Sequence, residues 1–283
     1  MIHNSIPSTD FFGIQVSRMI LGDNPFNGHS YIPDIYSDDE MLDYYTADRC
    51  VKSLFEAEEN GINTYMALAS PFILRVIRQY RNQGGKMHIM FQSYPPIDLE
   101  VNINQMMACN PIAIYHQGGT FDYICEEGQT DEIHKRLELI RSSGVASGLG
   151  THVPETVIQS EHEKWDVDFY MTCLYNARKT QRGQQSGFIT GKPKQLVFYH
   201  EDRLLMFEAI RKAKKPCIAF KIFAGGQIFY GKTEAEIPET AEAAIKETYD
   251  NIKPNDMICV GVFQKEKNQI KENADAAKKS LSF

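Results

Sequence analysis

The sequence predicts an α/β protein built as a (β/α)8 TIM barrel. Short apolar runs alternate with longer amphipathic segments, eight such runs can be counted, and 283 residues is a normal length for this fold. An open doubly wound sheet is the alternative, but residues 21–29, LGDNPFNGH, contain no GxGxxG turn after the first run. We therefore expect a single barrel domain over residues 1–283.

The expected strands are the eight apolar runs, each short enough for a barrel strand and bounded by turn-forming or polar residues. They cover residues 16–21, 62–68, 87–92, 111–116, 145–149, 167–173, 216–222 and 257–262.

Helices are expected between these strands, and one segment carries clear end signals. Within residues 37–61, Ser37 and Glu40 have the spacing of a capping box, and Gly61 is a suitable C-terminal stop. We therefore expect one long helix between the first two strands.

A second helix is expected between the fourth and fifth strands. Ile133, Leu137 and Ile140 recur at helical spacing, and Gly144 follows them as a stop. This segment should pack one apolar face against the barrel.

One connection is much longer than a compact barrel requires. Residues 174–199, LYNARKTQRGQQSGFITGKPKQLVFY, show little periodicity and follow the sixth expected strand. Barrel enzymes carry their chemistry at the carboxyl ends of the strands, so this loop is a candidate active-site lid.

Composition narrows the class of protein. The net charge is −7 and no apolar stretch approaches membrane-spanning length, so we expect a cytoplasmic protein that binds a small molecule and neither nucleic acid nor membrane. The six cysteines show no CxxC spacing and are expected to be buried thiols. The pattern does not predict an oligomeric state.

A lysine interrupts the seventh expected strand, where residues 217–229 read CIAFKIFAGGQIF. Three interpretations of Lys221 stay open. Burial could lower its pKa and make it a base or a Schiff-base amine. It could instead remain charged as an anchor for a phosphate or carboxylate, or pair with a buried carboxylate in a structural role.

Four polar residues follow the carboxyl ends of expected strands: Asp23, His29, His116 and His152. If they converge, imidazole and carboxylate groups of this kind suit a divalent metal, although ordinary loop hydrogen bonds are the alternative for His29 and His152. His116 is expected in the pocket because it ends the fourth strand, with a hydrogen-bonded core histidine as the alternative, and His152 is a further catalytic candidate.

The segment GDNPFNGHSY, residues 22–31, has two interpretations. It is either a turn rich in Asn and Gly, or a surface on which Asp23, Asn24, Asn27 and His29 contact a sugar-like substrate while aromatic residues pack on its ring. Tyr94 and Asn176, which follow the third and sixth strands, are also expected substrate contacts.

Several stretches, in order, resemble the aldo/keto reductase superfamily. They are VSRMILG, EAEENGINTYMA, LIRSSGVASGLGTHVPETV, YNARK, LLMFEAIRKAKKPCIAFKIFAGG and CVGVFQKEKNQIKENADAA. The resemblance implies a barrel whose reductases use a tyrosine, a lysine, an aspartate and a histidine. Met66 and Pro71 occupy the aspartate and tyrosine positions, Gln92 or a neighbour replaces the lysine, and only His116 matches.

The resemblance also implies a cofactor site. Lys265, Gln269 and Asn273 repeat the family's spacing for gripping the adenosine end of NADP(H), with Gly226 as a further cofactor contact. The alternative is a solvated helix start. NADP(H) is thus a possible cofactor, and a divalent metal is a second one.

Two functional classes follow. The first is a divergent barrel enzyme that uses Lys221, His116 and His152 for isomerisation, elimination or hydrolysis of a small carbonyl or sugar-like substrate. The second is an NADP(H)-dependent oxidoreductase whose acid has moved to a nearby tyrosine. Its candidates are Tyr65, Tyr94 and Tyr115. A barrel that binds a ligand without catalysis is the remaining alternative.

Overall fold

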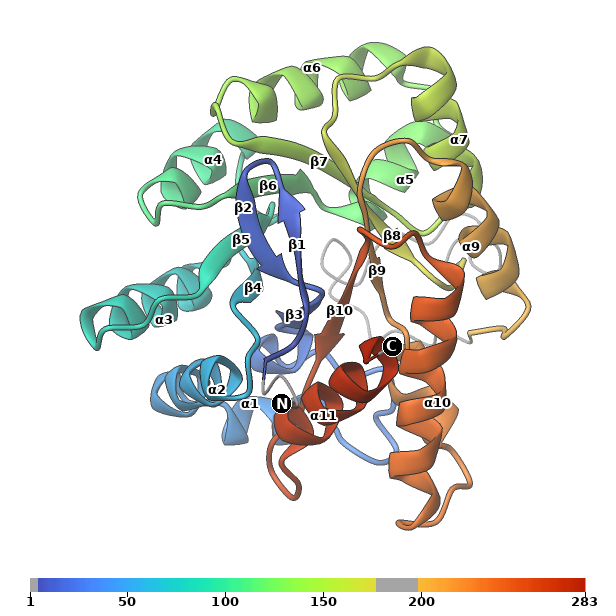
Figure 1. Ribbon diagram of the computed structural model, residues 1–283. Helices are drawn as coiled ribbons and strands as arrows, with labels where there is room; N and C mark the ends of the chain where they lie inside the picture. Colours follow the sequence, from blue (N-terminus) through green and yellow to red (C-terminus); the bar gives the residue numbers. More distant parts are fainter. Residues whose placement is uncertain (1–4, 177–197, 283) are drawn as a thin grey trace.

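The computed structural model describes residues 5–176 and 198–282. Its eight parallel strands close into a barrel in the order β10-β3-β4-β5-β6-β7-β8-β9, with helices around the outside (Figure 1). The predicted (β/α)8 fold is confirmed. Most of the candidate lid, residues 177–197, lies outside the described residues.

Every barrel strand begins and ends within three residues of its expected limits. The strands are β3 (Met19–Gly22), β4 (Thr64–Leu68), β5 (His88–Gln92), β6 (Ala113–His116), β7 (Ala146–Thr151), β8 (Phe169–Cys173), β9 (Cys217–Phe220) and β10 (Met257–Gly261).

The helices follow the strands in the expected alternation, with two short 3-10 helices at the barrel mouth. They are η1 (Asn24–Asn27), α1 (Asp38–Tyr44), α2 (Ala47–Glu59), α3 (Pro71–Asn82), α4 (Leu99–Met107), α5 (Gly118–Glu126), α6 (Thr130–Arg141), α7 (Pro154–Glu163), α9 (Asp202–Lys212), η2 (Ala224–Phe229), α10 (Glu236–Asn251) and α11 (Gln269–Leu281). Within the described residues, no helix is both long and apolar enough to cross a bilayer.

The helix expected over residues 37–61 is divided in two. Ser37 caps α1 by accepting a hydrogen bond from the Glu40 N–H, as expected. Thr46 then adopts an extended conformation, and its hydroxyl accepts a hydrogen bond from the Arg49 N–H and caps α2. The helix is therefore interrupted after Tyr45. A second N-cap inside an otherwise helical pattern is the reason for the break.

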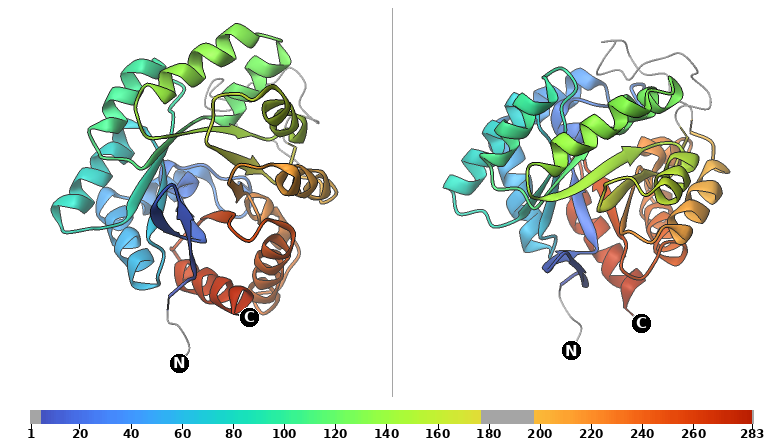
Figure 2. Two further views of the ribbon diagram at one scale, coloured as in Figure 1. Left: turned by 45° about the horizontal axis from the view of Figure 1, so that its top comes forward. Right: turned by 90° about the horizontal axis from the view of Figure 1, so that it is seen from above.

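An N-terminal hairpin, which the sequence analysis missed, closes one end of the barrel. Strands β1 (Ser8–Phe11) and β2 (Ile14–Ser17) pair antiparallel across that end (Figures 1 and 2). Phe11 packs edge-on against Phe169 of the barrel at 5.3 Å between ring centroids. The first expected strand therefore combined the end of β2 with β3, which Arg18 separates.

Side chains of the barrel strands alternate between two cores. In β4, Met66 belongs to the core inside the barrel, whereas Tyr65 and Ala67 belong to the core between barrel and helices. In β6, Tyr115 points inward and Ile114 outward in the same way. This alternation decides which strand residues can reach the barrel mouth.

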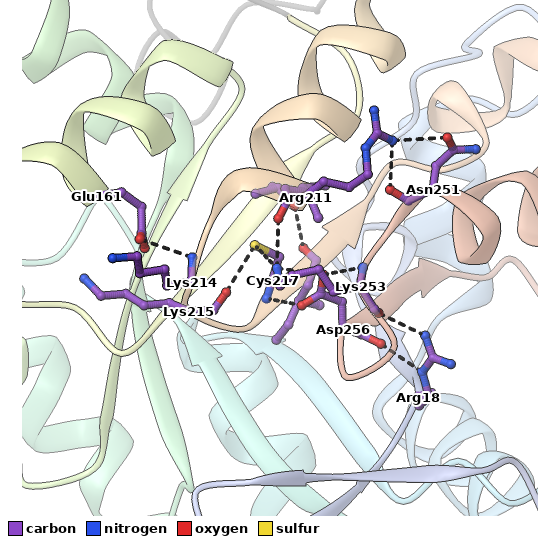
Figure 3. A network of polar contacts seen from close by, with 12 residues as sticks. Arg18, Glu161, Arg211, Lys214, Lys215, Cys217, Asn251, Lys253 and Asp256 are labelled. Carbon is purple, nitrogen blue, oxygen red and sulfur yellow. Dashed lines mark hydrogen bonds and ion pairs between the residues drawn. The ribbon is translucent and has the colours of Figure 1, made fainter.

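A buried carboxylate joins the start of β9 to the turn before β10 (Figure 3). Asp256 is fully buried, and its two oxygens accept hydrogen bonds from the backbone N–H groups of Cys217 (2.8 Å) and Lys253 (2.9 Å). The Lys253 ammonium lies 2.9 Å from the same carboxylate, and the Arg18 Nε donates to the Asp256 carbonyl. The carboxylate thus ties the start of β9 to the turn before β10, and the backbone carbonyl of Asp256 adds the link to Arg18 between β2 and β3.

We expect Asp256→Ala to cost about 3–5 kcal/mol of unfolding free energy, because the Lys253 cation and two backbone N–H groups lose their partner. The control is Asp250→Ala, which breaks an exposed ion pair with Lys246 and should cost under about 1 kcal/mol. Urea unfolding measures both. Equal losses would contradict a specific role for the buried carboxylate.

Candidate active site

A cavity of about 220 Å³ opens at the carboxyl ends of the barrel strands. The β1–β2 hairpin lies at the other end of the barrel (Figure 2). Side chains from β4, β5, β6, β8 and β9 form the floor of the cavity, and the chain segments that follow β3, β9 and β10 form its walls. It is small beside typical ligand pockets of roughly 300–1,000 Å³, which favours a compact ligand over a dinucleotide.

Lys221 enters this cavity because the backbone turns directly after β9. Its φ of 57° lies in the left-handed region, which ends the strand's alternation at Phe220. The ammonium lies 4.7 Å from the centre of the Tyr31 ring and 5.4 Å from that of Phe220. A non-glycine residue in this conformation is uncommon and is a feature of strained functional sites.

A chain of polar contacts reaches Lys221 from behind. The Asp122 carboxylate lies 2.8 Å from Nδ1 of His152, and Nε2 of His152 lies 3.2 Å from the Lys221 Nζ. A carboxylate accepts, so Nδ1 carries the imidazole proton and Nε2 accepts from the ammonium. Asp122 thereby orients His152, and His152 holds Lys221.

The charge state of Lys221 follows from its surroundings. Burial lowers the pKa of Lys221, but its interactions with Tyr31, Cys173 and Asp122 outweigh burial and leave the pKa above its ordinary value. The side chain is therefore an ammonium at neutral pH. This favours the anchoring interpretation of Lys221 over the interpretation as a free amine base or a Schiff-base nucleophile.

Asp122 was not among the expected site residues. It lies on α5, fully buried, and also accepts hydrogen bonds from the Thr151 hydroxyl (2.5 Å) and the His152 N–H (2.9 Å). The helix can come this close to β7 because residue 118 is a glycine without a side chain. A Cβ at this position would lie only 3.1 Å from the Gly150 carbonyl carbon. In the sequence, Asp122 could have been noticed as a carboxylate about one helical turn after the pair Gly118 and Gly119.

Asp23 lies at the opposite side of the mouth from His152 and lines the cavity. Its Oδ2 accepts hydrogen bonds from the Leu68 N–H (2.7 Å), Asn27 (3.1 Å) and the Tyr65 hydroxyl (3.3 Å). Burial raises the pKa of Asp23 to about 6, although these hydrogen bonds oppose the shift. Because all its side-chain bonds within the described residues fall on Oδ2, Oδ1 is left for a ligand.

The segment after β3 supplies only part of the expected substrate surface. Asn24 and His29 line the cavity, and the Asn24 amide lies 3.4 Å from the Tyr31 hydroxyl. Asn27 turns away, bonding Asp23 and the Ser70 hydroxyl. Phe26, one of the aromatic residues of this segment that were expected to pack on a ligand ring, is instead buried against Tyr45.

Two further expected contacts do not reach the cavity. The Tyr94 backbone N–H donates to Asn102, and its ring packs partly buried against the outer core. The Asn176 N–H donates to the Asp202 carboxylate. Neither residue lines the cavity, because these contacts hold them in the segments that follow β5 and β8.

His116 lies on the wrong face of its strand for the expected role. It follows the inward-pointing Tyr115, so its ring points to the helix layer, where it packs on Phe121 and contacts Arg136 at 3.2 Å. Burial, with the Arg136 charge, lowers the pKa of His116 to about 4. The expected placement in the pocket rested on its position at the end of the strand and on the family resemblance. Successive strand residues point to opposite faces, so the residue after the inward-pointing Tyr115 points outward.

The three tyrosines considered as relocated acids have different positions. Tyr65 points to the outer core and bonds Asp23, and Tyr94 stays outside the cavity. Tyr115 does line the cavity floor and donates its proton to Gln92 at 2.6 Å. Burial raises the pKa of Tyr65 and of Tyr115 well above the ordinary value, which makes both weaker acids.

The expected NADP(H) face does not lie on one helix. Helix α11 begins at Gln269 with Asn268 as its cap, so Lys265 belongs to the preceding loop, where it pairs with Glu40. Gln269 lines the cavity but accepts the Phe263 N–H at 2.9 Å, and Asn273 is buried. The spacing of four residues predicted that all three side chains lie on successive turns of one helix. Because the helix begins at Gln269, only Gln269 and Asn273 belong to it.

Gly226 lines the cavity wall, but packing explains this glycine and its neighbour. A Cβ on Gly225 would lie 2.6 Å from the Tyr31 Cβ, and one on Gly226 would lie 2.9 Å from the Ile32 Cδ1. Both residues also have positive φ angles. The Gly-Gly turn therefore lets the segment after β3 lie directly on the segment after β9.

The four expected metal ligands are not brought together. His116 points out of the barrel, and His152 is engaged with Asp122 and Lys221. Among the residues that the structure describes, no three His, Cys, Asp or Glu side chains are placed to hold a metal ion. The six cysteines are free thiols, and five of them are buried, as expected.

Comparison with known proteins supports the fold. No protein-family model matches the chain, and no curated protein sequence is significantly similar to it. The apo form of Gox0644 is 10% identical with a TM-score of 0.58, over 99% of this chain and 89% of that one. Dihydropteroate synthase from Yersinia pestis is 9% identical with a TM-score of 0.54, over 98% and 97%.

A truncated 3-deoxy-D-arabino-heptulosonate 7-phosphate synthase from Thermotoga maritima is 11% identical with a TM-score of 0.51, over 98% of this chain and 90% of that one. At such identities the likeness shows a barrel fold that enzymes use, and no reaction. The two named synthases are not aldo/keto reductases, and no family model supports that resemblance. The expected membership of that superfamily is contradicted and is not retained.

Asp23 should make the stability of the protein depend on pH. Because the folded-state pKa is about 6 and the ordinary value is 3.8, its stabilising contribution is present below about pH 4 and lost as the pH rises through 6. Relative to Asp23→Asn, the unfolding free energy of the wild-type protein should fall by about 2 kcal/mol between pH 4 and pH 7. Chemical denaturation at a series of pH values measures this. A difference that rises or stays level would contradict the assigned shift.

Proposed function

We propose that the barrel mouth is the active site of a non-redox enzyme that moves a proton on a small anionic carbonyl compound. The observation that carries this proposal is the Asp122–His152–Lys221 chain, which holds a charged ammonium at the wall of a cavity that Asp23 also lines. The barrel fold, which enzymes of other families share, supports a catalytic role by analogy.

Lys221 is suited to stabilise developing negative charge. A carbonyl oxygen placed beside its ammonium becomes an enolate oxygen when the neighbouring carbon loses a proton. The two aromatic rings around the ammonium limit its access to water, and a fixed charge in such a place stabilises an oxyanion more than the same charge in solution. This assigns Lys221 the electrostatic role.

Asp23 is suited to move the proton. The carboxylate takes a proton from the carbon beside the carbonyl, and the C–H electron pair becomes the carbon–carbon π bond while the carbonyl π pair moves to oxygen. Return of the proton to carbon restores the ketone, and its transfer to oxygen gives the enol. A pKa of about 6 lets the same carboxyl group accept and donate near neutral pH.

Asp122 and His152 are positioning residues in this scheme. Their hydrogen bonds fix one imidazole tautomer and direct its lone pair at the ammonium, so Lys221 must break a buried hydrogen bond to leave the cavity. The strained backbone at Lys221 is maintained by the same contacts.

Proton exchange tests the proposal directly. In deuterium oxide, the protein should accelerate deuterium incorporation beside the carbonyl of at least one member of a panel of aliphatic and aromatic 2-oxo acids, followed by proton NMR. Lys221→Met and Asp23→Asn should each reduce the accelerated rate by about 100-fold or more. Lys246→Met, which alters an exposed lysine on α10, should leave it unchanged.

Two outcomes would overturn this assignment. One is full exchange activity in a folded Lys221→Met variant. The other is no acceleration of exchange for any acid of the panel, and binding of those acids without exchange would mark the barrel as a non-catalytic receptor.

A further inference from the structure

We propose that the substrate is an aromatic 2-oxo acid whose ring carries a hydroxyl group at the end far from the carboxylate. This inference rests on the proposed function for its reacting end, and it assigns the rest of the molecule. The acid end lies beside Lys221, the ring crosses the barrel axis, and the hydroxyl reaches the amide of Gln92.

The order of strands places these groups around the rim. Lys221 follows β9 and Gln92 ends β5, and four strand steps separate β9 from β5 in the closed barrel of eight. Lys221 and Gln92 therefore lie on opposite walls. Asp23 follows β3, which is two steps from each, so its free oxygen faces the middle of a ligand that spans the cavity.

Gln92 presents a hydrogen-bond donor to the cavity. Its Oε1 accepts the Tyr115 hydroxyl proton at 2.6 Å, which fixes the orientation of the amide. Within the described residues this is the only hydrogen bond of its side chain, so the Nε2 donors are left to a ligand oxygen. The Tyr115 hydroxyl donates its hydrogen bond to Gln92, so its oxygen can accept a hydrogen bond from a ligand hydroxyl.

The wall between the two polar ends is apolar. Met66 and Met171 lie on facing sides of the barrel interior, and Phe220 closes the floor beside Lys221. Methionine sulfur and aromatic edges make favourable contacts with an aromatic ring. A flat ring therefore fits this wall better than a polyhydroxylated chain, whose hydroxyls would lose their hydrogen bonds there.

A carboxylate fits the charged end better than a phosphate. Among the described residues that line the cavity, Lys221 is the lone lysine, and no arginine joins it. A phosphate dianion is usually met by several donors, and the adjacent Gly-Gly turn is packed against Tyr31 and Ile32. One ammonium matches the single negative charge of a carboxylate.

A set of related probes tests the assignment by calorimetric titration at pH 7. The set comprises 4-hydroxyphenylacetate, phenylacetate, 4-hydroxyphenethyl alcohol and phenyl phosphate. We expect the first to bind tightest, with affinity about 10-fold lower without the ring hydroxyl and lower again without the carboxylate. Phenyl phosphate should bind no more tightly than phenylacetate.

Two variants locate the groups on the protein. Gln92→Leu should lower the affinity for 4-hydroxyphenylacetate by about 10-fold and leave the affinity for phenylacetate unchanged, because only the first ligand bonds the Gln92 amide. Lys221→Met should lower the affinity for both acids and leave the affinity for the alcohol unchanged. Gln159→Leu, an exposed glutamine on α7, is the matched control.

The results separate this inference from the proposed function. Binding of the hydroxylated acid with this variant pattern, but without deuterium exchange on any 2-oxo acid, would retain the ligand class and remove the catalytic role. Exchange on aliphatic acids alone, with no binding of the aromatic set, would retain the catalytic role and remove the proposed ligand class. Equal weakening of both acids by Gln92→Leu, or tighter binding of phenyl phosphate, would overturn the ligand class.

Discussion

The site depends on a single chain of buried hydrogen bonds from Asp122 through His152 to Lys221. A lone ammonium in an aromatic pocket would lose its proton or leave for solvent, since burial disfavours the charged form. Interactions of the ammonium with Tyr31 and Cys173, and with the Asp122 carboxylate on α5 beyond His152, offset that cost. These interactions make a lysine in an apolar run tolerable, at the point where the strand ends at Phe220 and the backbone turns into the left-handed conformation.

Three parts of the chain must pack closely for these groups to meet. Helix α5 approaches β7 because Gly118 has no side chain, which brings Asp122 to His152. The segment after β3 lies on the Gly-Gly turn after β9, which brings the Tyr31 ring over the ammonium. Glycines thus create both contacts, and the catalytic candidates lie where elements packed through glycine meet at the mouth.

The fold could be predicted from the sequence because apolar periodicity is a local property, and the eight barrel strands appear near their expected limits. The hairpin was missed because Arg18 interrupts only briefly what looks like one strand. Of the site, Asp23, His152 and Lys221 were expected, whereas His116 was placed on the wrong face because its position was counted without the period of two. Asp122 and the Gln92 amide depend on contacts between distant segments, which spacing along the chain does not reveal.

The central claim is that His152 is a neutral imidazole with its proton on Nδ1 and its Nε2 lone pair on the Lys221 ammonium. Nitrogen-15 NMR of the histidine side chains at pH 7, assigned by comparison with His152→Gln, measures this most directly. The account predicts a protonated Nδ1 and an unprotonated Nε2 that shifts when Lys221 is replaced by methionine. An imidazolium, the opposite tautomer, or an Nε2 signal indifferent to Lys221→Met would contradict it.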